Sequence, residues 1–228
     1  MEEYPIEFFD NHIIAHIDGK SILIDTGSPI SLGDCRSIQL LGNNYSLYSK
    51  CLNFSIDDIS ELLGKKVNVL LGGDILRDIY FYINCDKKII QFSSEPLSIN
   101  GEQILIVLEN NVPTLDLQIN GNNFKAFLDT GAKISYIDPE ITSNYKSIGR
   151  ANDFYPGLGR FQTNIYEVPI TLGSYSFTIV AGNLPDILQM LSFILNSKVF
   201  LGNDIFKFFN VYFSYRDKKI VLVKKIQH

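Results

Sequence analysis

Two short acidic signatures are the part of this sequence with clear chemical potential. Asp25-Thr26-Gly27-Ser28 and Asp129-Thr130-Gly131-Ala132 lie 104 residues apart, each at the end of an apolar run. One Asp-Thr-Gly arises by chance in about one of twenty chains of this size, but two copies in matching surroundings do not. Two carboxyl groups that face each other cannot both ionise easily, so one keeps a proton while the other stays charged. Such a pair can activate water for attack on a carbonyl: the ionised group takes a proton, and the protonated group donates to the developing oxyanion.

The segments before the two signatures have the same pattern. Residues 16–24 contain Asp18-Gly19 between two apolar runs, and residues 118–128 contain Asn120-Gly121 in the equivalent place. Asp-Gly and Asn-Gly supply the positive φ angles that tight hairpin turns require. Each signature is therefore predicted to follow the second strand of a β-hairpin.

A second pair of motifs follows downstream in the same order. Residues 69–76 and 199–206 each read as three apolar residues, Gly, any residue, Asp and two apolar residues. Asp86-Lys87-Lys88 and Asp217-Lys218-Lys219 then follow at nearly the same spacing. The order of motifs indicates an internal duplication.

Most of the remaining chain has the character of β-strands. Short runs rich in β-branched and aromatic residues are bounded by Gly, Asn or Pro. Residues 55–63 open with a Ser-x-x-Asp capping signal and end at Gly64, which predicts a helix, and residues 184–195 predict a helix at the equivalent place. The polar segment 93–103 is expected to link two domains, residues 1–92 and residues 104–228.

The paired signatures and the downstream apolar-apolar-Gly motifs resemble those of aspartic peptidases of the pepsin and retropepsin group. The resemblance extends from about Phe8 to Val223. It implies a catalytic dyad of Asp25 and Asp129, with Thr26 and Thr130 bracing the two loops beneath it. It also implies that Gly27 and Gly131 direct backbone N–H groups toward the carboxylates.

Each half is close in size to one subunit of the dimeric, retroviral-type enzymes. The resemblance therefore implies a mainly β fold of two pseudo-symmetric retropepsin-like barrel lobes in one chain, with one short helix in each lobe. Since both Asp residues belong to one chain, we expect a monomer. The expected partner is a polypeptide substrate, without cofactor or metal.

The two halves differ in length between the signature and the Gly motif. Asp25 and Gly72 are 47 residues apart, whereas Asp129 and Gly202 are 73 apart. The extra residues surround 153–161, where the family carries a flap that folds over the substrate. Tyr155, Gly157, Leu158 and Gly159 are its expected substrate-binding residues, and an ordinary surface hairpin is the alternative. In the first half, residues 35–54 leave room only for a short flap or none.

A further difference lies directly after each Asp-Thr-Gly. Ser28 is expected to donate a hydrogen bond to the outer oxygen of Asp25, which Ala132 cannot do for Asp129. Asp25 is therefore predicted to be the more readily ionised partner, although the pair must titrate as a unit. Asp74 and Asp204, which follow the Gly motifs, are interpreted as helix N-caps.

Four apolar residues near the motifs are candidate walls of a substrate pocket. They are Ile30, Leu76, Ile134 and Ile205. The 12 tyrosines and 16 phenylalanines are interpreted mainly as core and cleft lining.

Composition excludes several classes of function. The net charge is −5 and no basic stripe is present, which argues against a nucleic-acid partner. No apolar run approaches the roughly 20 residues that span a bilayer, and the N-terminus lacks the pattern of a signal peptide. Cys35, Cys51 and Cys85 are expected to be free thiols, so a soluble, cytoplasmic protein is predicted. His12 and His16 lack a third ligand nearby, so no metal site is expected.

Two functions remain open at this level. The first is an active aspartic endopeptidase, because both Asp residues and both Thr residues are present. The second is a peptide-binding or scaffold protein that keeps the fold without cutting.

Overall fold

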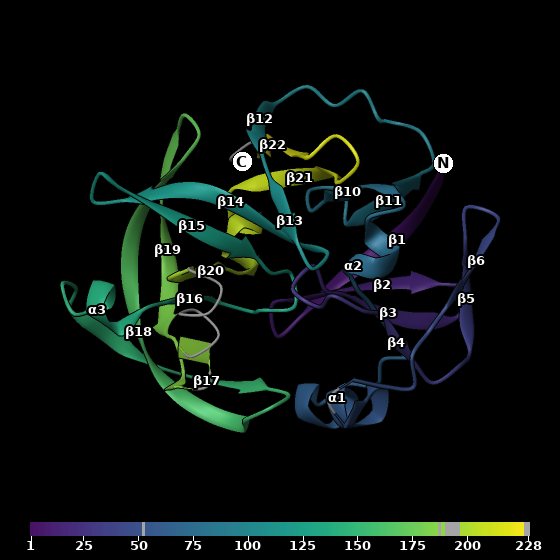
Figure 1. Cartoon of the computed structure of the whole chain (residues 1–228), viewed down its shortest axis with the longest axis horizontal. Helices are drawn as coiled ribbons and strands as arrows, with labels where there is room; N and C mark the ends of the chain where they lie inside the picture. The colour runs from purple at the N-terminus through teal and green to yellow at the C-terminus, as the bar shows by residue number, and fades with distance from the viewer. Residues whose placement is uncertain (52, 187, 190–196, 226–228) are drawn as a thin grey trace.

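The computed structural model describes residues 1–51, 53–186, 188–189 and 197–225, and these form a mainly β protein (Figure 1). The expected fold class is confirmed. The elements of the first half are β1 (Glu2–Phe9), β2 (His12–Ile17), β3 (Lys20–Ile24), β4 (Leu32–Gly33), β5 (Ser37–Leu40), β6 (Asn43–Ser46), β7 (Lys50–Cys51), β8 (Phe54–Ser55), α1 (Ile56–Leu63), β9 (Val69–Leu71), α2 (Gly73–Leu76), β10 (Tyr80–Asn84) and β11 (Ile89–Ser93). Those of the second half are β12 (Glu102–Leu105), β13 (Val107–Glu109), β14 (Val112–Ile119), β15 (Asn122–Leu128), β16 (Ser135–Ile137), α3 (Pro139–Thr142), β17 (Ser147–Tyr155), β18 (Gly159–Leu172), β19 (Tyr175–Asn183), β20 (Val199–Leu201), the 3₁₀ helix η1 (Asn203–Lys207), β21 (Phe209–Ser214) and β22 (Lys219–Lys224).

One large sheet joins the two halves of the chain. Its order is β12-β22-β21-β10-β11-β1-β2-β3-β9-β4, and the antiparallel pair β10–β21 connects strands of the first half to strands of the second. A second sheet, β13-β14-β15-β20-β16-β19-β18-β17, belongs entirely to the second half. The segment 94–101 contains no strand and arches over the top of the molecule to β12 (Figure 1).

Both expected hairpins before the acidic signatures are confirmed. The pairs β2–β3 and β14–β15 are antiparallel, and their turns at Asp18-Gly19 and Asn120-Gly121 have positive φ at both residues. In each half the second hairpin strand also pairs in parallel with the strand of the Gly motif, β3 with β9 and β15 with β20. The end of that motif strand is therefore held beside the acidic loop.

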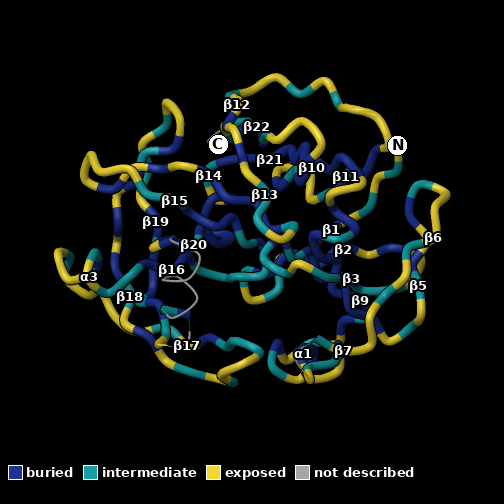
Figure 2. Tube along the Cα trace, viewed as in Figure 1, coloured by how far each residue is buried: buried dark blue, intermediate teal, exposed yellow. Residues whose placement is uncertain are grey.

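The buried core passes through the junction of the halves (Figure 2). Phe81 of β10 stacks on Phe213 of β21 with ring centroids 4.4 Å apart, and Tyr215 meets both rings edge-on. Ring pairs of this kind add to the burial of apolar area. The junction thus gives the two acidic loops a rigid common base.

Helix α1 forms where the sequence predicted it. Ser55 is its N-cap and makes a capping box with Asp58, and Gly64 ends the helix with a φ of 76°. Short helical segments also occur at α2, α3 and η1. The helix expected over 184–195 falls largely outside the described residues.

The two halves carry very different hairpins after the acidic loops. In the second half β17 and β18 pair from Ser147 to Tyr166, and in Figure 1 this long hairpin runs along the bottom with its turn beside α1. In the first half the short hairpin β5–β6 lies at the right-hand edge of the view. Among the described residues, none of the helices has the length and apolar character needed to cross a bilayer. All three cysteines are free, as expected.

Candidate functional site

The two acidic loops meet through their threonines. The Thr26 backbone N–H donates to Thr130 Oγ1, and the Thr130 N–H donates to Thr26 Oγ1, both at 2.9 Å. Each hydroxyl in turn donates to a carbonyl of the opposite half, Thr26 to Leu128 at 2.6 Å and Thr130 to Ile24 at 2.7 Å. Both threonines are fully buried. This reciprocal arrangement fixes the two loops face to face, as the resemblance implied.

Asp25 and Asp129 are brought together above this interlock. Gly27 donates its N–H to Asp25 Oδ1 at 3.0 Å, and Gly131 donates to Asp129 Oδ1 at 2.8 Å. A Cβ on Gly131 would lie 2.5 Å from Asp25 Oδ1, and a Cβ on Gly27 would overlap the Asp129 carboxyl. Glycine is therefore required because each carboxyl rests against the backbone of the opposite loop.

The two carboxyl groups share a hydrogen bond and perturb each other's titration. Burial is the main cause that raises the pKa of Asp25 well above its usual range, and the nearby Asp129 charge adds to this rise. Burial also raises the pKa of Asp129, while N–H donors of its own loop and the Asp25 hydrogen bond oppose the rise. Because burial raises both pKa values and the two carboxyl groups interact, the pair favours a singly protonated state and titrates as a unit. The prediction that Asp25 is the more readily ionised partner stays a prediction, since burial raises the pKa of both carboxyl groups.

A raised carboxyl pKa lowers stability at neutral pH. Between the ordinary value of 3.8 and the raised value, the folded protein binds more protons than the unfolded chain. The free energy of unfolding must therefore fall as pH rises through this window. We expect Asp25→Asn to raise the melting temperature at pH 7, with the gain vanishing below about pH 3.8. Calorimetry at pH 7 and below about pH 3.8 measures the melting temperatures of the variant and the wild type. The exposed Asp116→Asn is the matched control, and an equal gain at both pH values would contradict the linkage.

Ser28 does not have the predicted role. Its hydroxyl donates to the Ile30 carbonyl at 2.7 Å, and only its backbone N–H donates to Asp25 Oδ1, at 2.9 Å. The side chain is occupied in shaping its own loop, which the sequence could not reveal. The Ala132 backbone N–H donates to the Asp129 backbone carbonyl at 3.2 Å, and its nearness also lowers the pKa of the Asp129 carboxyl.

Replacement of Ser28 by Ala is accordingly expected to leave the pH dependence of any hydrolysis unchanged. Loss of the bond to Ile30 should lower the free energy of unfolding by about 1 kcal/mol. Rate profiles from acid to neutral pH, together with urea unfolding, measure both effects. If the acidic side of the pH–rate profile were shifted in Ser28→Ala, the Ser28 hydroxyl would stabilise ionised Asp25, as the sequence predicted.

Asp74 and Asp204 are not helix N-caps, since Gly72 and Gly202 hold those positions. Asp74 accepts a 2.6 Å bond from the Ser31 hydroxyl, and Asp204 accepts a 3.2 Å bond from the Ser135 backbone N–H. Ser31 and Ser135 each also accept from the N–H of the motif glycine. Both Asp residues therefore tie the Gly motif to the segment after the acidic loop.

Two asparagines that the sequence analysis overlooked connect each half to the opposite acidic loop. Asn11, in the turn between β1 and β2, donates to the Lys133 carbonyl, and Asn111 donates to the Pro29 carbonyl at 3.2 Å. Both have positive φ, 64° and 69°. The signal was present in the sequence, because Asp10-Asn11 and Asn110-Asn111 occupy equivalent places in the two halves.

The hairpin of β17 and β18 brings Tyr155 to the acidic pair. Burial raises the pKa of the Tyr155 phenol, and the charges of Asp129 and Asp25 raise it further. Gly159 has a φ of 77° at the turn, whereas Gly157 does not have positive φ. Leu158 lies at the tip and is exposed. The tip of the hairpin thus lies near the acidic pair.

The four candidate pocket walls divide into two groups. Leu76 and Ile205 are fully buried in the main core, so they support the loops from beneath and are not pocket walls. Ile134 is partly buried in one cluster with Tyr155, and Ile30 packs against a second cluster with Phe154. Only Ile30 and Ile134 therefore remain near the hairpin.

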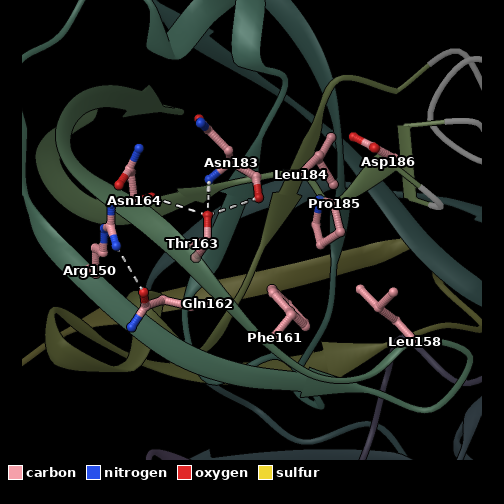
Figure 3. A pocket seen from close by; sticks show the side chains of 10 residues that line it. All are labelled: Arg150, Leu158, Phe161, Gln162, Thr163, Asn164, Asn183, Leu184, Pro185 and Asp186. Atoms are coloured by element: carbon pink, nitrogen blue, oxygen red, sulfur yellow. Dashed lines mark hydrogen bonds between the residues drawn. The ribbon is translucent and has the colours of Figure 1, made fainter.

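Two cavities flank the hairpin. One of about 560 Å³ lies against Phe161, Gln162 and Leu184, and Figure 3 shows Thr163 hydrogen-bonded to Asn183 in its wall. The other, of about 520 Å³, lies between Lys133, Phe154 and the end of α1. Asp25 and Asp129 line neither of these two cavities.

His12 and His16 differ in their surroundings. His12 is buried, whereas His16 is exposed and lies 3.0 Å from Glu7. Within the described parts of the chain, no cluster of three His, Cys, Asp or Glu side chains has metal-binding geometry.

Comparison with known proteins gives matches among solved structures alone. No protein-family model matches, and no curated protein matches by sequence. The solution structure of Simian Foamy Virus (mac) protease aligns with 18% identity and a TM-score of 0.30, covering 39% of this chain and 86% of that chain. A retropepsin-like aspartic protease from Rickettsia conorii aligns with 14% identity and a TM-score of 0.38, covering 56% of this chain and 95% of that one. The foamy viral protease-reverse transcriptase in complex with an RNA/DNA hybrid aligns with 16% identity and a TM-score of 0.33, over 42% of this chain and 12% of that one.

Proposed function

We propose that this protein is an aspartic endopeptidase that hydrolyses peptide bonds with water activated between Asp25 and Asp129. One observation carries the proposal: the reciprocal Thr26–Thr130 interlock holds two partly buried carboxyl groups face to face, each against the glycine of the opposite loop. Maintaining such a pair costs stability at neutral pH, because both pKa values are raised by burial. A protein that served only as a scaffold would gain nothing from this loss of stability.

The chemistry requires one proton shared by two carboxyl groups. The ionised carboxylate of the pair takes a proton from the attacking water, and its protonated partner donates to the carbonyl oxygen as this becomes an oxyanion. Gly27 and Gly131 hold the inner oxygens in place with their N–H groups. No covalent intermediate is needed in this scheme.

The substrate is a polypeptide bound beneath the hairpin of β17 and β18. Tyr155, Gly157, Leu158 and Gly159 cover it from above, and Ile30 and Ile134 contact it from the two loops. The hairpin excludes bulk water from the reacting bond, which strengthens the electrostatic interactions there. These assignments rest on the closeness of Tyr155 to both carboxyl groups.

We also propose that the chain arose by internal duplication as two retropepsin-like lobes, residues 1–92 and 104–228, joined by residues 93–103. The matching order of hairpin, acidic loop and parallel motif strand supports this division. Because one chain supplies both carboxyl groups, the protein functions as a monomer. The three free thiols fit a reducing compartment such as the cytoplasm.

A peptide library incubated with the protein from pH 3 to pH 7.5 tests the activity. Mass spectrometry of the products should reveal internal cleavage with a maximum on the acidic side of neutrality, because one proton must remain on the pair. Binding of peptides without cleavage at any pH would instead identify a peptide-binding module.

A further inference from the structure

A buried carboxyl group lies outside the acidic pair, in the hairpin of β17 and β18. Asp153 is 7% exposed and accepts hydrogen bonds from the Tyr136 hydroxyl and, at 2.8 Å, from the Phe154 backbone N–H. Burial raises the pKa of this carboxyl, and the two donors oppose the rise. A buried carboxyl is stable only when such partners are present. Breaking the Tyr136 bond would therefore carry a large cost.

Tyr136 belongs to the rigid body of the second half. It lies in β16, directly after the Asp129 loop, and β16 pairs with both β19 and β20. Its side chain is 5% exposed, and its ring packs 6.1 Å from the Phe161 ring. The hydroxyl that holds Asp153 is therefore fixed relative to Asp129.

Beyond Asp153 the hairpin touches the first half of the chain at Phe154, which also packs against the apolar cluster around Ile14 and Leu63, and at Arg160. The Phe154 ring stacks on His12 at 5.7 Å, and Arg160 donates to the Glu61 carbonyl of α1 at 3.0 Å. Arg160 is exposed, so water can replace its bond. These contacts hold the tip, which carries Tyr155, near the acidic pair.

We infer that the Tyr136–Asp153 hydrogen bond is a hinge pin. The tip of the hairpin, residues 154–160, lifts and closes about this bond, while the stem, residues 149–153, stays fixed. Tyr136 and Asp153 are thus positioning residues: each time the tip closes, they return Tyr155 to the same place beside the carboxyl pair. Their effect on hydrolysis rests on the proposed function, whereas the pin itself does not.

Several charged and titratable groups surround Asp153. The charged and titratable groups that face it are Tyr136, His12, Lys133 and Asp129. Burial lowers the pKa of His12, which leaves that ring neutral beside Phe154. Lys133 is paired with Asp10 at 2.9 Å.

Amide hydrogen exchange of the full chain tests the pin with two variants that act on different contacts. Arg160→Ala should increase exchange about tenfold for residues 154–160 and leave residues 149–153 protected. Tyr136→Phe should increase exchange about tenfold or more across 149–163, since the stem is released as well. Tyr48→Phe, at a 56% exposed tyrosine, is the matched control and should change neither region.

If residues 149–153 were equally protected from hydrogen exchange in Tyr136→Phe and wild type, the Tyr136–Asp153 bond would not be a hinge pin. If Tyr136→Phe does not fold, Arg160→Ala decides alone: increased exchange that extends through 149–153 would also overturn it. In kinetics, Tyr136→Phe should raise KM at least about fivefold and change kcat less. A released stem in a protein that cleaves no peptide would refute the proposed function while supporting the pin.

Discussion

Replacement of either Asp25 or Asp129 by Asn is expected to reduce peptide hydrolysis by about 10³-fold to 10⁴-fold. Each substitution removes one of the two groups that must exchange protons with water and oxyanion in the same step. The Asn side chain keeps the volume and can still accept the N–H bonds of Gly27 or Gly131, so the fold should persist. Initial rates on the best library peptide, measured over the whole pH range, give the effect.

The double variant supplies the decisive control for this prediction. Because the two carboxyl groups act as one unit, Asp25→Asn with Asp129→Asn together should be hardly less active than either single variant. Asp116→Asn, at an exposed position of β14, should retain full activity. Cleavage that survived either single substitution would refute the dyad.

Replacement of Thr26 or Thr130 by Val should lower the free energy of unfolding by about 2–5 kcal/mol. Val has a similar shape, but loss of one hydroxyl leaves a buried N–H and a buried carbonyl of the opposite half without partners. Each unpaired buried group costs about 1–3 kcal/mol. Urea denaturation followed by circular dichroism measures the loss.

A double-mutant cycle on the two threonines tests whether they form one interlock. Since each hydroxyl serves the other loop, the combined loss should be clearly smaller than the sum of the two single losses. Thr178→Val, at an exposed position of β19, should change the free energy by no more than about 0.5 kcal/mol. Additive effects would show that the two loops are held independently.

The sequence by itself determined the local elements around the site. Asp18-Gly19 and Asn120-Gly121 dictate tight hairpin turns, because few other residue pairs tolerate two successive positive φ angles. Ser55, Asp58 and Gly64 define both ends of α1 through hydrogen bonds within a few residues. The repeated order of these signals also predicted which two carboxyl groups would meet.

Only the tertiary structure decided how side chains with several possible partners were used. The Ser28 hydroxyl bonds to Ile30 rather than Asp25, and Asp74 and Asp204 tie loops together rather than cap helices. The Tyr136–Asp153 bond depends on how a long hairpin folds back over the body of the second half. Backbone turns follow from the φ angles that individual residues allow, whereas a hydroxyl or carboxyl binds whichever partner the packing of distant strands brings within reach.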